Sequence, residues 1–308
     1  MPIVLNSRAV AHMAAMAVLI LAALAAGTAG ALAYGASRWR GRIRKFRARM
    51  AAARLPIAGT AYNPEEIAYL PPPVRRYFGA VLQAGQPIVT GMRLTQEGRF
   101  RRDGDEWRPF TATQVVTTRP PGFDWDARMS MAPGVTAYVQ DAYAAGEGRL
   151  HAEALALITV ADARGTPESA QGELLRYLAE AVWYPTALLP SQGVRWEAVD
   201  DSAARATLTD GATTVSLAFG FDSEGLITSC NAAARCREVV DGVPEFAPWL
   251  GRFWAYETRD GMRIPMEGEV AWEMPAGPVP YFRARLGKIS YEFARQSDLR
   301  SRWSHADN

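Results

Sequence analysis

The sequence predicts an α+β protein, in which an N-terminal transmembrane helix precedes a large curved antiparallel sheet of about 11–12 strands. Two or three helices are expected to pack on one face of that sheet. Three observations predict this fold: a long apolar run near the N-terminus, many short segments of alternating polarity after it, and Asp-Gly pairs between them, at Asp210-Gly211, Asp241-Gly242 and Asp260-Gly261. Asp-Gly favours tight hairpins because both residues tolerate positive φ. Consecutive hairpins build an antiparallel sheet, and a sheet this wide must curl.

The apolar run predicts a transmembrane anchor over residues 1–37. From Val10 to Tyr34 the chain is almost wholly Ala, Leu, Met, Val, Ile and Gly, and about 20 such residues span a bilayer. The alternative is a signal peptide cleaved after Ala31-Leu32-Ala33. The length of the run and the arginines that follow it favour the uncleaved anchor. Ala26 and Gly30, four positions apart, leave open a homo-oligomer formed through the anchor.

A basic collar and linker is predicted over residues 38–62. No acidic residue precedes Glu65, and eight cations lie between Arg38 and Arg54. The positive-inside rule therefore places the following domain in the cytoplasm. The collar also suits anionic headgroups, so membrane lipid is an expected partner, with Trp39 and Phe46 at the interface. The alternative, which we favour, is that the collar only fixes the topology. After the collar, 25 basic and 32 acidic residues remain, and a domain of that sign has no electrostatic footprint for nucleic acid.

A single β-rich globular domain is predicted over residues 63–295, followed by a polar tail over 296–308. Asn63-Pro64 begins a short helix that Pro71 ends, and a second helix follows the prolines. Five strands are expected between residues 89 and 158, the last of them over 149–158. Thr166-Pro167 then begins a strong helix that ends at Pro185, and seven further strands are expected between residues 194 and 293.

Several short stretches resemble an uncharacterised family of bacterial proteins that is described only as a domain of unknown function. The resemblance extends from about residue 72 to 291, through PVRRYF (73–78), PGFDWDAR (121–128), GELLRYLAE (172–180) and GEVAW (268–272). It implies a bacterial inner (plasma) membrane for the anchor and brings no activity. More loosely, the order of strands and helix resembles the half-barrel of lipoprotein-sorting carriers, which implies apolar ligands held between sheet and helices. Fold alone does not fix function.

The sequence contains no recognisable catalytic, metal or cofactor motif. The three histidines are dispersed, and neither Cys230 nor Cys236 belongs to a CxxC pair. Gly146-Glu147-Gly148 lacks the third glycine and the following helix of a nucleotide-binding turn. We therefore expect no metal and no cofactor, and we predict no catalytic residue.

The candidate ligand-binding residues are one polar group and several aromatic or sulfur-containing side chains. Glu173, Arg176 and Glu180 share one helix face, because they lie three and four positions apart. An ion-pair ladder is the alternative interpretation of that group. Trp125, Met129 and Met131 share one strand face. The complete set also includes residues near the end of the helix and one on a late strand: Tyr177, Trp183, Tyr184 and Trp272. A plain hydrophobic core is the alternative interpretation of these apolar residues.

These observations predict a membrane-tethered binding module that holds a lipid or another apolar ligand between sheet and helices. The first alternative is an enzyme that acts on a membrane-proximal substrate, with Glu173, Glu180 or Asp126 as acid or base. The second is an interaction scaffold without a pocket. A perturbed carboxylate in a cleft would favour the enzyme.

Overall fold

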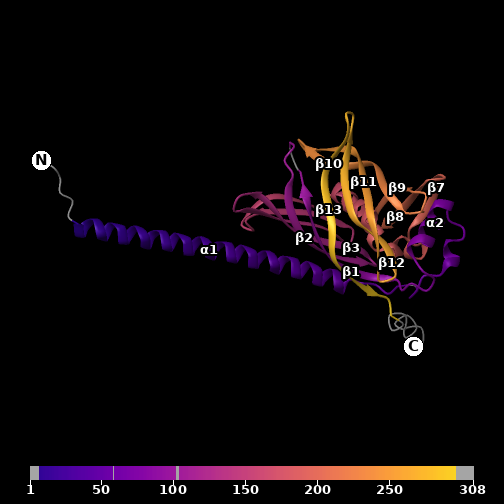
Figure 1. Ribbon diagram of the computed structural model, residues 1–308, viewed down its shortest axis with the longest axis horizontal. Coiled ribbons are helices and arrows are strands. Elements are labelled where there is room, and N and C mark those ends of the chain that lie inside the picture. Colours follow the sequence, from indigo (N-terminus) through magenta and orange to yellow (C-terminus); the bar gives the residue numbers. More distant parts are fainter. Residues whose placement is uncertain (1–6, 58, 102–103, 296–308) are drawn as a thin grey trace.

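One antiparallel sheet of 13 strands forms the centre of the molecule in the computed structural model, which describes residues 7–57, 59–101 and 104–295 (Figure 1). The predicted polar tail, 296–308, lies outside the described residues. The strands run in the order β6-β5-β4-β3-β2-β1-β13-β12-β11-β10-β9-β8-β7. The first six and the last seven strands thus form two meanders, and pairing of β1 with β13 joins them. This architecture confirms the predicted fold class.

The strands of the first meander are β1 (Val89–Phe100), β2 (Arg108–Thr118), β3 (Pro121–Ala132), β4 (Val135–Ala144), β5 (Glu147–Ala154) and β6 (Ile158–Arg164). Those of the second are β7 (Arg195–Asp200), β8 (Ala203–Asp210), β9 (Thr213–Phe221), β10 (Ile227–Val240), β11 (Val243–Arg259), β12 (Met262–Met274) and β13 (Gly277–Phe293).

The expected strand over 149–158 is two strands, β5 and β6, which explains why the sheet has more strands than the sequence predicts. The turn between them is Leu155-Ala156-Leu157, in which Leu155 and Ala156 have φ of 55° and 57°. Apolar residues rarely adopt this left-handed conformation, so the turn carries no sequence signal. Most of β6 is also exposed, because it is an edge strand and lacks the alternation of a half-buried one.

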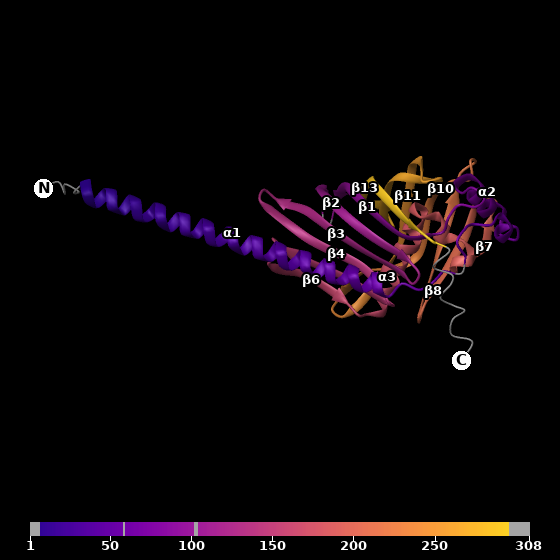
Figure 2. The same ribbon diagram turned by 90° about the horizontal axis from the view of Figure 1, so that it is seen from below.

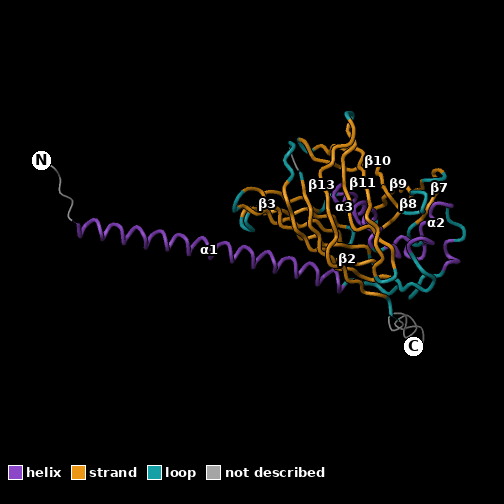
Figure 3. Tube along the Cα trace, viewed as in Figure 1, coloured by secondary structure: helices purple, strands orange, loops and turns teal. Residues whose placement is uncertain are grey.

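The concave side of the sheet is filled by helix α3 (Pro167–Glu180) and the three 3-10 turns after it, η2 (Ala181–Trp183), η3 (Pro185–Leu188) and η4 (Pro190–Gln192) (Figure 3). Helix α3 packs against β5, β9 and β10. At one end lie the short η1 (Pro64–Ile67) and α2 (Pro72–Val81), the latter packed on β8 and β12. Side chains from η1, α2, α3, η2 and η3 merge with those of the sheet into one hydrophobic core.

Helix α1 (Ser7–Ala52) is continuous through the apolar run and the basic stretch, and it extends far beyond the sheet (Figures 1 and 2). Its residues 11–34 are exposed. Among the described residues, α1 is the one helix that is long and apolar enough to cross a membrane, with a mean hydropathy of 2.2 over its most apolar window. The later half lies alongside the sheet, beginning at Gly35, whose Cβ, if present, would lie 2.7 Å from the Ala156 carbonyl oxygen.

The basic half of α1 packs on the face of the sheet opposite α3. Successive strand residues point to opposite faces: Trp125 points towards Arg176 of α3, whereas Asp124 and Asp126 bond to Arg47 and Trp39 of α1. The expectation that Trp39 sits at a membrane interface is wrong. Its side chain is fully buried, because the indole stacks on His151 and donates a hydrogen bond of 2.7 Å to Asp126.

Ion pairs connect the arginines of α1 to carboxylates that the sheet buries. Arg38 and Arg42 pair with Glu153 at 2.8 and 2.9 Å, and Arg47 pairs with Asp124 at 2.6 Å. Both carboxylate side chains are at most 1% exposed. Burial favours the neutral form of Glu153, but His151, Arg42 and Arg38 hold the pKa of that carboxyl below its ordinary value. These arginines therefore compensate charges that the sheet alone would leave unpaired.

Candidate functional site

Helix α3 is held close to the sheet at its first turn. The Thr166 hydroxyl accepts a hydrogen bond from the backbone N–H of Ser169, and the backbone N–H of Thr166 donates one to the Ser169 hydroxyl, so the two residues form a capping box. The Ser169 hydroxyl also donates to the Gly148 carbonyl at 3.2 Å. A Cβ on Gly148 would lie 2.1 Å from the Ser169 carbonyl oxygen. Glycine is therefore required for α3 to approach β5 this closely.

Between α3 and the sheet, five charged side chains and one amide form a cluster, which we call the interior cluster: Gln114, Asp141, Glu173, Arg176, Glu180 and Arg235. Arg176 is its centre, because the guanidinium donates to Glu180 at 2.7 Å and to Asp141 at 2.8 Å. Glu180 also accepts from Gln114. Arg235, from β10, approaches Glu173 at 3.7 Å. Three carboxylates thus surround two guanidiniums in the interior.

Aromatic rings surround this polar cluster. The Arg176 guanidinium lies 4.9 Å from the Trp125 ring centroid and 5.0 Å from that of Phe123, and Arg235 lies 4.9 Å from the Trp249 ring. Cation–π attraction of this kind is strongest where water is excluded. The cluster therefore sits in an aromatic environment of low polarity, in which unpaired charge is costly.

Three acceptor atoms of the interior cluster are buried and have no hydrogen-bond partner among the described residues: Gln114 Oε1, Asp141 Oδ1 and Glu173 Oε2. Next to them, the amide nitrogen Nε2 of Gln96 is also without a partner, although Gln96 Oε1 accepts from the Trp125 indole at 2.6 Å. Buried polar atoms in proteins are normally satisfied. The interior cluster therefore has capacity to accept hydrogen bonds from a bound group.

Burial dominates the protonation of the two carboxylates that retain unpartnered atoms. Desolvation, together with the nearby charge of Asp141, raises the pKa of Glu173 to about 7. Desolvation also raises the pKa of Asp141, although Arg176 and Arg235 oppose it. Glu173 therefore changes its charge near neutral pH, so the cluster can exchange a proton under physiological conditions.

Most of the predicted ligand-binding residues lie together around this cluster. Trp125, Met129, Tyr177, Trp183 and Tyr184 are buried, Glu173, Arg176 and Glu180 belong to the cluster itself, and Trp272 stacks on Tyr281 at 5.7 Å. Met131 is separate, because its side chain is 39% exposed at the end of β3. Sequence reasoning missed Asp141, Arg235 and Gln114, since they come from three distant strands and no local spacing connects them to α3. Among the described residues, no group of three His, Cys, Asp or Glu side chains is placed to hold a metal ion.

Replacing Glu173 with glutamine is expected to change how stability depends on pH. Because the folded-state pKa of about 7 lies above the ordinary value of 4.5, the folded state binds the proton more tightly than the unfolded state. Glu173 thus lowers stability progressively as pH rises from 4.5 to 7, by up to about 3 kcal/mol. The Glu173→Gln variant should lose that decline, as measured by urea unfolding of the full chain in detergent at pH 5 and pH 8.

Glu168→Gln is the matched control for this change, since Glu168 lies in the first turn of the same helix, where it is only half-buried and outside the interior cluster. That variant should keep the wild-type pH dependence. Parallel curves for wild type and Glu173→Gln would show that Glu173 titrates normally and that this description of the cluster is wrong.

The structure defines an α+β protein in which a half-barrel encloses a buried charged cluster and carries a long N-terminal helix on its outer face. The chain belongs to the family of unknown function DUF6920, whose model matches residues 68–291. This confirms the resemblance seen in the sequence. None of the curated proteins matches the chain.

Two solved structures show distant similarity. A LolA superfamily protein from Nitrosomonas europaea is 10% identical with a TM-score of 0.32, covering 73% of this chain and 94% of that one. A β-barrel-like protein from Brucella abortus, with a domain of unknown function DUF1849, is 8% identical with a TM-score of 0.26, covering 67% of this chain and 99% of that one. Similarities this distant do not indicate a ligand or an activity.

Proposed function

We propose that the protein is a membrane-tethered binding module, and that its interior between sheet and α3 holds a lipid or another mostly apolar ligand. The observation that carries this proposal is the set of unpartnered acceptor atoms in the interior cluster. An aromatic interior with a few convergent polar groups is the usual composition of a ligand site.

The chemistry of the cluster indicates the polar end of the ligand. The unpartnered atoms of Gln114, Asp141 and Glu173 are all oxygens, so they pair with a donor: an ammonium, amide or hydroxyl group. The apolar part of the ligand would contact Trp125 and Met129, which lie on the same face of β3. Methionine adapts to flexible chains because its side chain is unbranched and polarizable.

We infer that a ligand enters by movement of α3. Two of the hollows at the surface of the described residues are a smaller one between α1 and strands β5 and β6 and a larger one on the sheet face that carries α1. Both lie on the opposite side of the sheet from α3. Because α3 is joined to β6 by a short turn and followed by three 3-10 turns, it is the element that can separate from the sheet without breaking a strand pair.

Tethering rests on the exposed apolar half of α1. The helix continues without interruption into its docked half, which supports an anchor that is retained rather than removed. Arg40, Arg44 and Lys45 remain exposed beyond the apolar run. These cations support the proposed orientation, with the half-barrel on the cytoplasmic side of a bacterial inner membrane. Membrane lipid is then both the surroundings of α1 and the nearest supply of ligand.

An enzyme remains the second candidate, because the pKa of Glu173 lies at about 7, where a general acid or base is most effective. The Glu173 side chain is enclosed between α3 and the sheet rather than in an open cleft, and this favours binding. A turnover that Glu173→Gln abolishes, with ligand affinity unchanged, would support the enzyme instead.

The binding proposal is tested by native mass spectrometry of the full chain released from detergent micelles. Wild type and the Glu168→Gln control are expected to keep a lipid-sized adduct at collision energies that remove surface-bound lipid from α1. Glu173→Gln is expected to keep less of it, because the glutamine amide replaces one acceptor oxygen with a donor.

Two outcomes would contradict the proposal. Wild-type protein that loses every adduct at the energy that removes surface lipid would have no interior ligand. Equal retention of the adduct by all three proteins would mean that the ligand does not bind at the interior cluster.

A further inference from the structure

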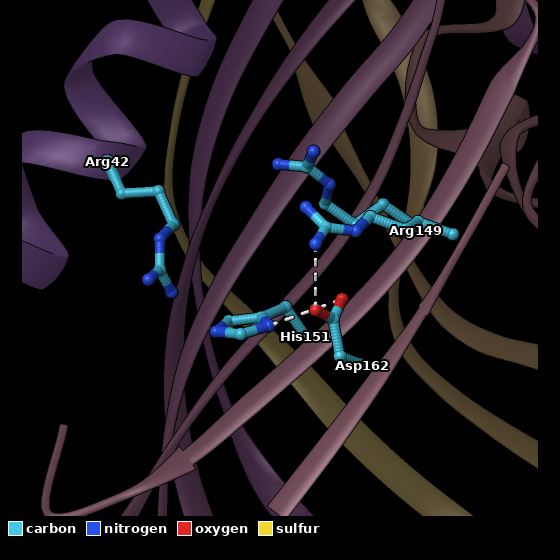
Figure 4. A pocket seen from close by; sticks show the side chains of 5 residues that line it. Arg42, Arg149, His151 and Asp162 are labelled. Atoms are coloured by element: carbon cyan, nitrogen blue, oxygen red, sulfur yellow. Dashed lines mark ion pairs between the residues drawn. The ribbon is translucent and has the colours of Figure 1, made fainter. Parts of the chain in front are cut away.

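A hollow of about 160 Å³ lies between α1 and strands β5 and β6, at one edge of the sheet and on the opposite face from the interior cluster (Figure 4). Three of its five lining residues are arginines, and the complete lining is Arg42, Arg149, His151, Asp162 and Arg164. Figure 4 shows Arg42 reaching in from the helix while the other side chains rise from the two strands. The sequence analysis did not single out this set, because its members come from three separate elements.

The position of the hollow is fixed by packing at its base. The His151 ring stacks on the buried Trp39 ring, with centroids 5.8 Å apart. The two nitrogens of His151 face carboxylates, Nε2 at 3.0 Å from Glu153 and Nδ1 at 3.4 Å from Asp162. The histidine is nearly buried, with 11% of its side chain exposed. The base of the hollow is therefore a packed surface rather than a set of free side chains.

The positive charges of the hollow exceed the negative ones. Arg42 pairs with Glu153, and Arg164 pairs with Asp162 at 3.2 Å. Arg149 forms no ion pair with any carboxylate in the described part of the chain; its guanidinium lies 5.7 Å from the Phe46 ring centroid. Glu153 is shared with Arg38. At least one cation is thus left without an anionic partner.

The surroundings of Arg149 disfavour its positive charge. Partial burial lowers the pKa of its guanidinium, and the like charges of Arg164 and Arg49 lower it further, although the carboxylate of Asp162 opposes them. Arginine stays charged in proteins, so the cost appears as repulsion that a bound anion would relieve. An arginine placed among other arginines, beside a hollow, is the arrangement by which proteins recognise phosphate.

We infer that this hollow binds a phosphate-class anion, either inorganic phosphate or the phosphate of a lipid headgroup, with Arg149 as the principal ligand and Arg42 and Arg164 beside it. The planar guanidinium matches two phosphate oxygens at once. A volume of about 160 Å³ is several times what one water molecule needs, so the hollow accommodates a phosphate group with part of its hydration.

The location makes both sources of phosphate accessible. Arg42 lies seven positions beyond Gly35, which is about 10 Å along the helix. The exposed apolar part of α1 ends just before Gly35. A headgroup at the surface of a membrane that α1 spans would therefore lie near the Arg42 side of the hollow, while the β5–β6 side opens to solvent. The headgroup source rests on the proposed membrane tethering, whereas the inorganic source does not.

The test measures thermal unfolding of the full chain in a maltoside detergent, which contains no phosphate. Sodium phosphate at 10 mM is compared with sodium chloride of equal ionic strength. Wild type is expected to gain about 3 °C in Tm from phosphate. Arg149→Gln should lose that gain and, without phosphate, should unfold at or above the wild-type temperature, because the substitution removes the repulsion. Arg44→Gln, an exposed change in the same helix as Arg42, should behave as wild type.

A second arm separates the sources of the anion. The full chain is reconstituted in nanodiscs of phosphatidylcholine, with or without one-fifth phosphatidate. If a headgroup fills the hollow, phosphatidate raises the Tm of wild type but not of Arg149→Gln, and added phosphate then has no effect. If inorganic phosphate is the ligand, its effect persists in both kinds of disc.

The inference is overturned if wild type, Arg149→Gln and Arg44→Gln gain equally from phosphate, since this would be general charge screening. It is also overturned if none of the three responds to phosphate or to phosphatidate. If phosphatidate has no effect in the discs but phosphate still stabilises the protein in detergent, the hollow binds inorganic phosphate and not a lipid headgroup. Because Arg149 does not contact the interior cluster, these outcomes are independent of the proposed apolar ligand.

Discussion

Replacing Arg176 with methionine is expected to destabilise the protein by about 3–5 kcal/mol, because it leaves buried carboxylates without their counter-charge. Arg176 is the only described residue that bonds to both Asp141 and Glu180. Methionine keeps much of the arginine's volume and its contacts with Trp125 and Phe123. The loss of stability therefore comes from the missing charge rather than from poorer packing. Unfolding of the full chain in urea measures the effect, which corresponds to a fall in Tm of about 10 °C.

Two further variants make this result specific. Arg205→Met removes an exposed arginine from β8 and should change stability by less than about 0.5 kcal/mol. The double variant Arg176→Met with Glu180→Gln should recover part of the loss, since it also removes one of the uncompensated carboxylates. A loss below about 1 kcal/mol in Arg176→Met would mean that water already reaches the cluster and that the interior is not the dry aromatic site described above.

Removal of residues 1–54 is expected to be far more damaging than removal of residues 1–34. The shorter deletion takes away only the exposed apolar half of α1. The longer deletion also removes Trp39, Ile43 and Met50, which are 0%, 4% and 4% exposed. Burial of side chains of this size contributes about 1.5–3 kcal/mol each. The longer deletion also takes Arg47 and Arg42 away from Asp124 and Glu153.

We expect the chain that begins at Gly35 to unfold cooperatively and the chain that begins at Leu55 to be destabilised by at least about 5 kcal/mol. Circular dichroism during heating measures both. Trp39→Ala in the full chain supplies an independent check, with an expected loss of about 3–5 kcal/mol. Equal melting of the two fragments would show that the basic half of α1 does not contribute to the folded domain.

The features of the fold that could be predicted from sequence are those with local signals. The hairpins at Asp210-Gly211 and Asp260-Gly261 were predictable because Asp-Gly favours a tight turn. Helix α3 was predictable from its N-cap, Thr166-Pro167. The β5–β6 hairpin was not, because its turn uses Leu155 and Ala156 at positive φ. The docking of α1 could not be predicted either, since Arg38 and Glu153 lie 115 positions apart.

The candidate site shows the same division. The spacing of Glu173, Arg176 and Glu180 was enough to place them on one face of α3, and Arg176 does bond to Glu180. The partners that turn this row into a buried cluster are Asp141 and Arg235, which a strand pairing and the curvature of the sheet bring together. The alternation of β4 and β10 alone does not reveal which of their polar residues faces the interior.

The continuity of α1 has a mechanical consequence for a protein held at a membrane. A domain on a flexible tether explores a volume that grows with the length of the tether. An uninterrupted helix, by contrast, behaves as a rigid post. Each residue adds about 1.5 Å, so Arg47, twelve positions beyond Gly35, lies about 18 Å farther along the helix axis. The ends of the β3–β4 and β5–β6 hairpins extend back along this post, towards its N-terminal half (Figures 1 and 2). The half-barrel would therefore work at one height and one orientation, and any tilt of the spanning segment would be transmitted to it undiminished.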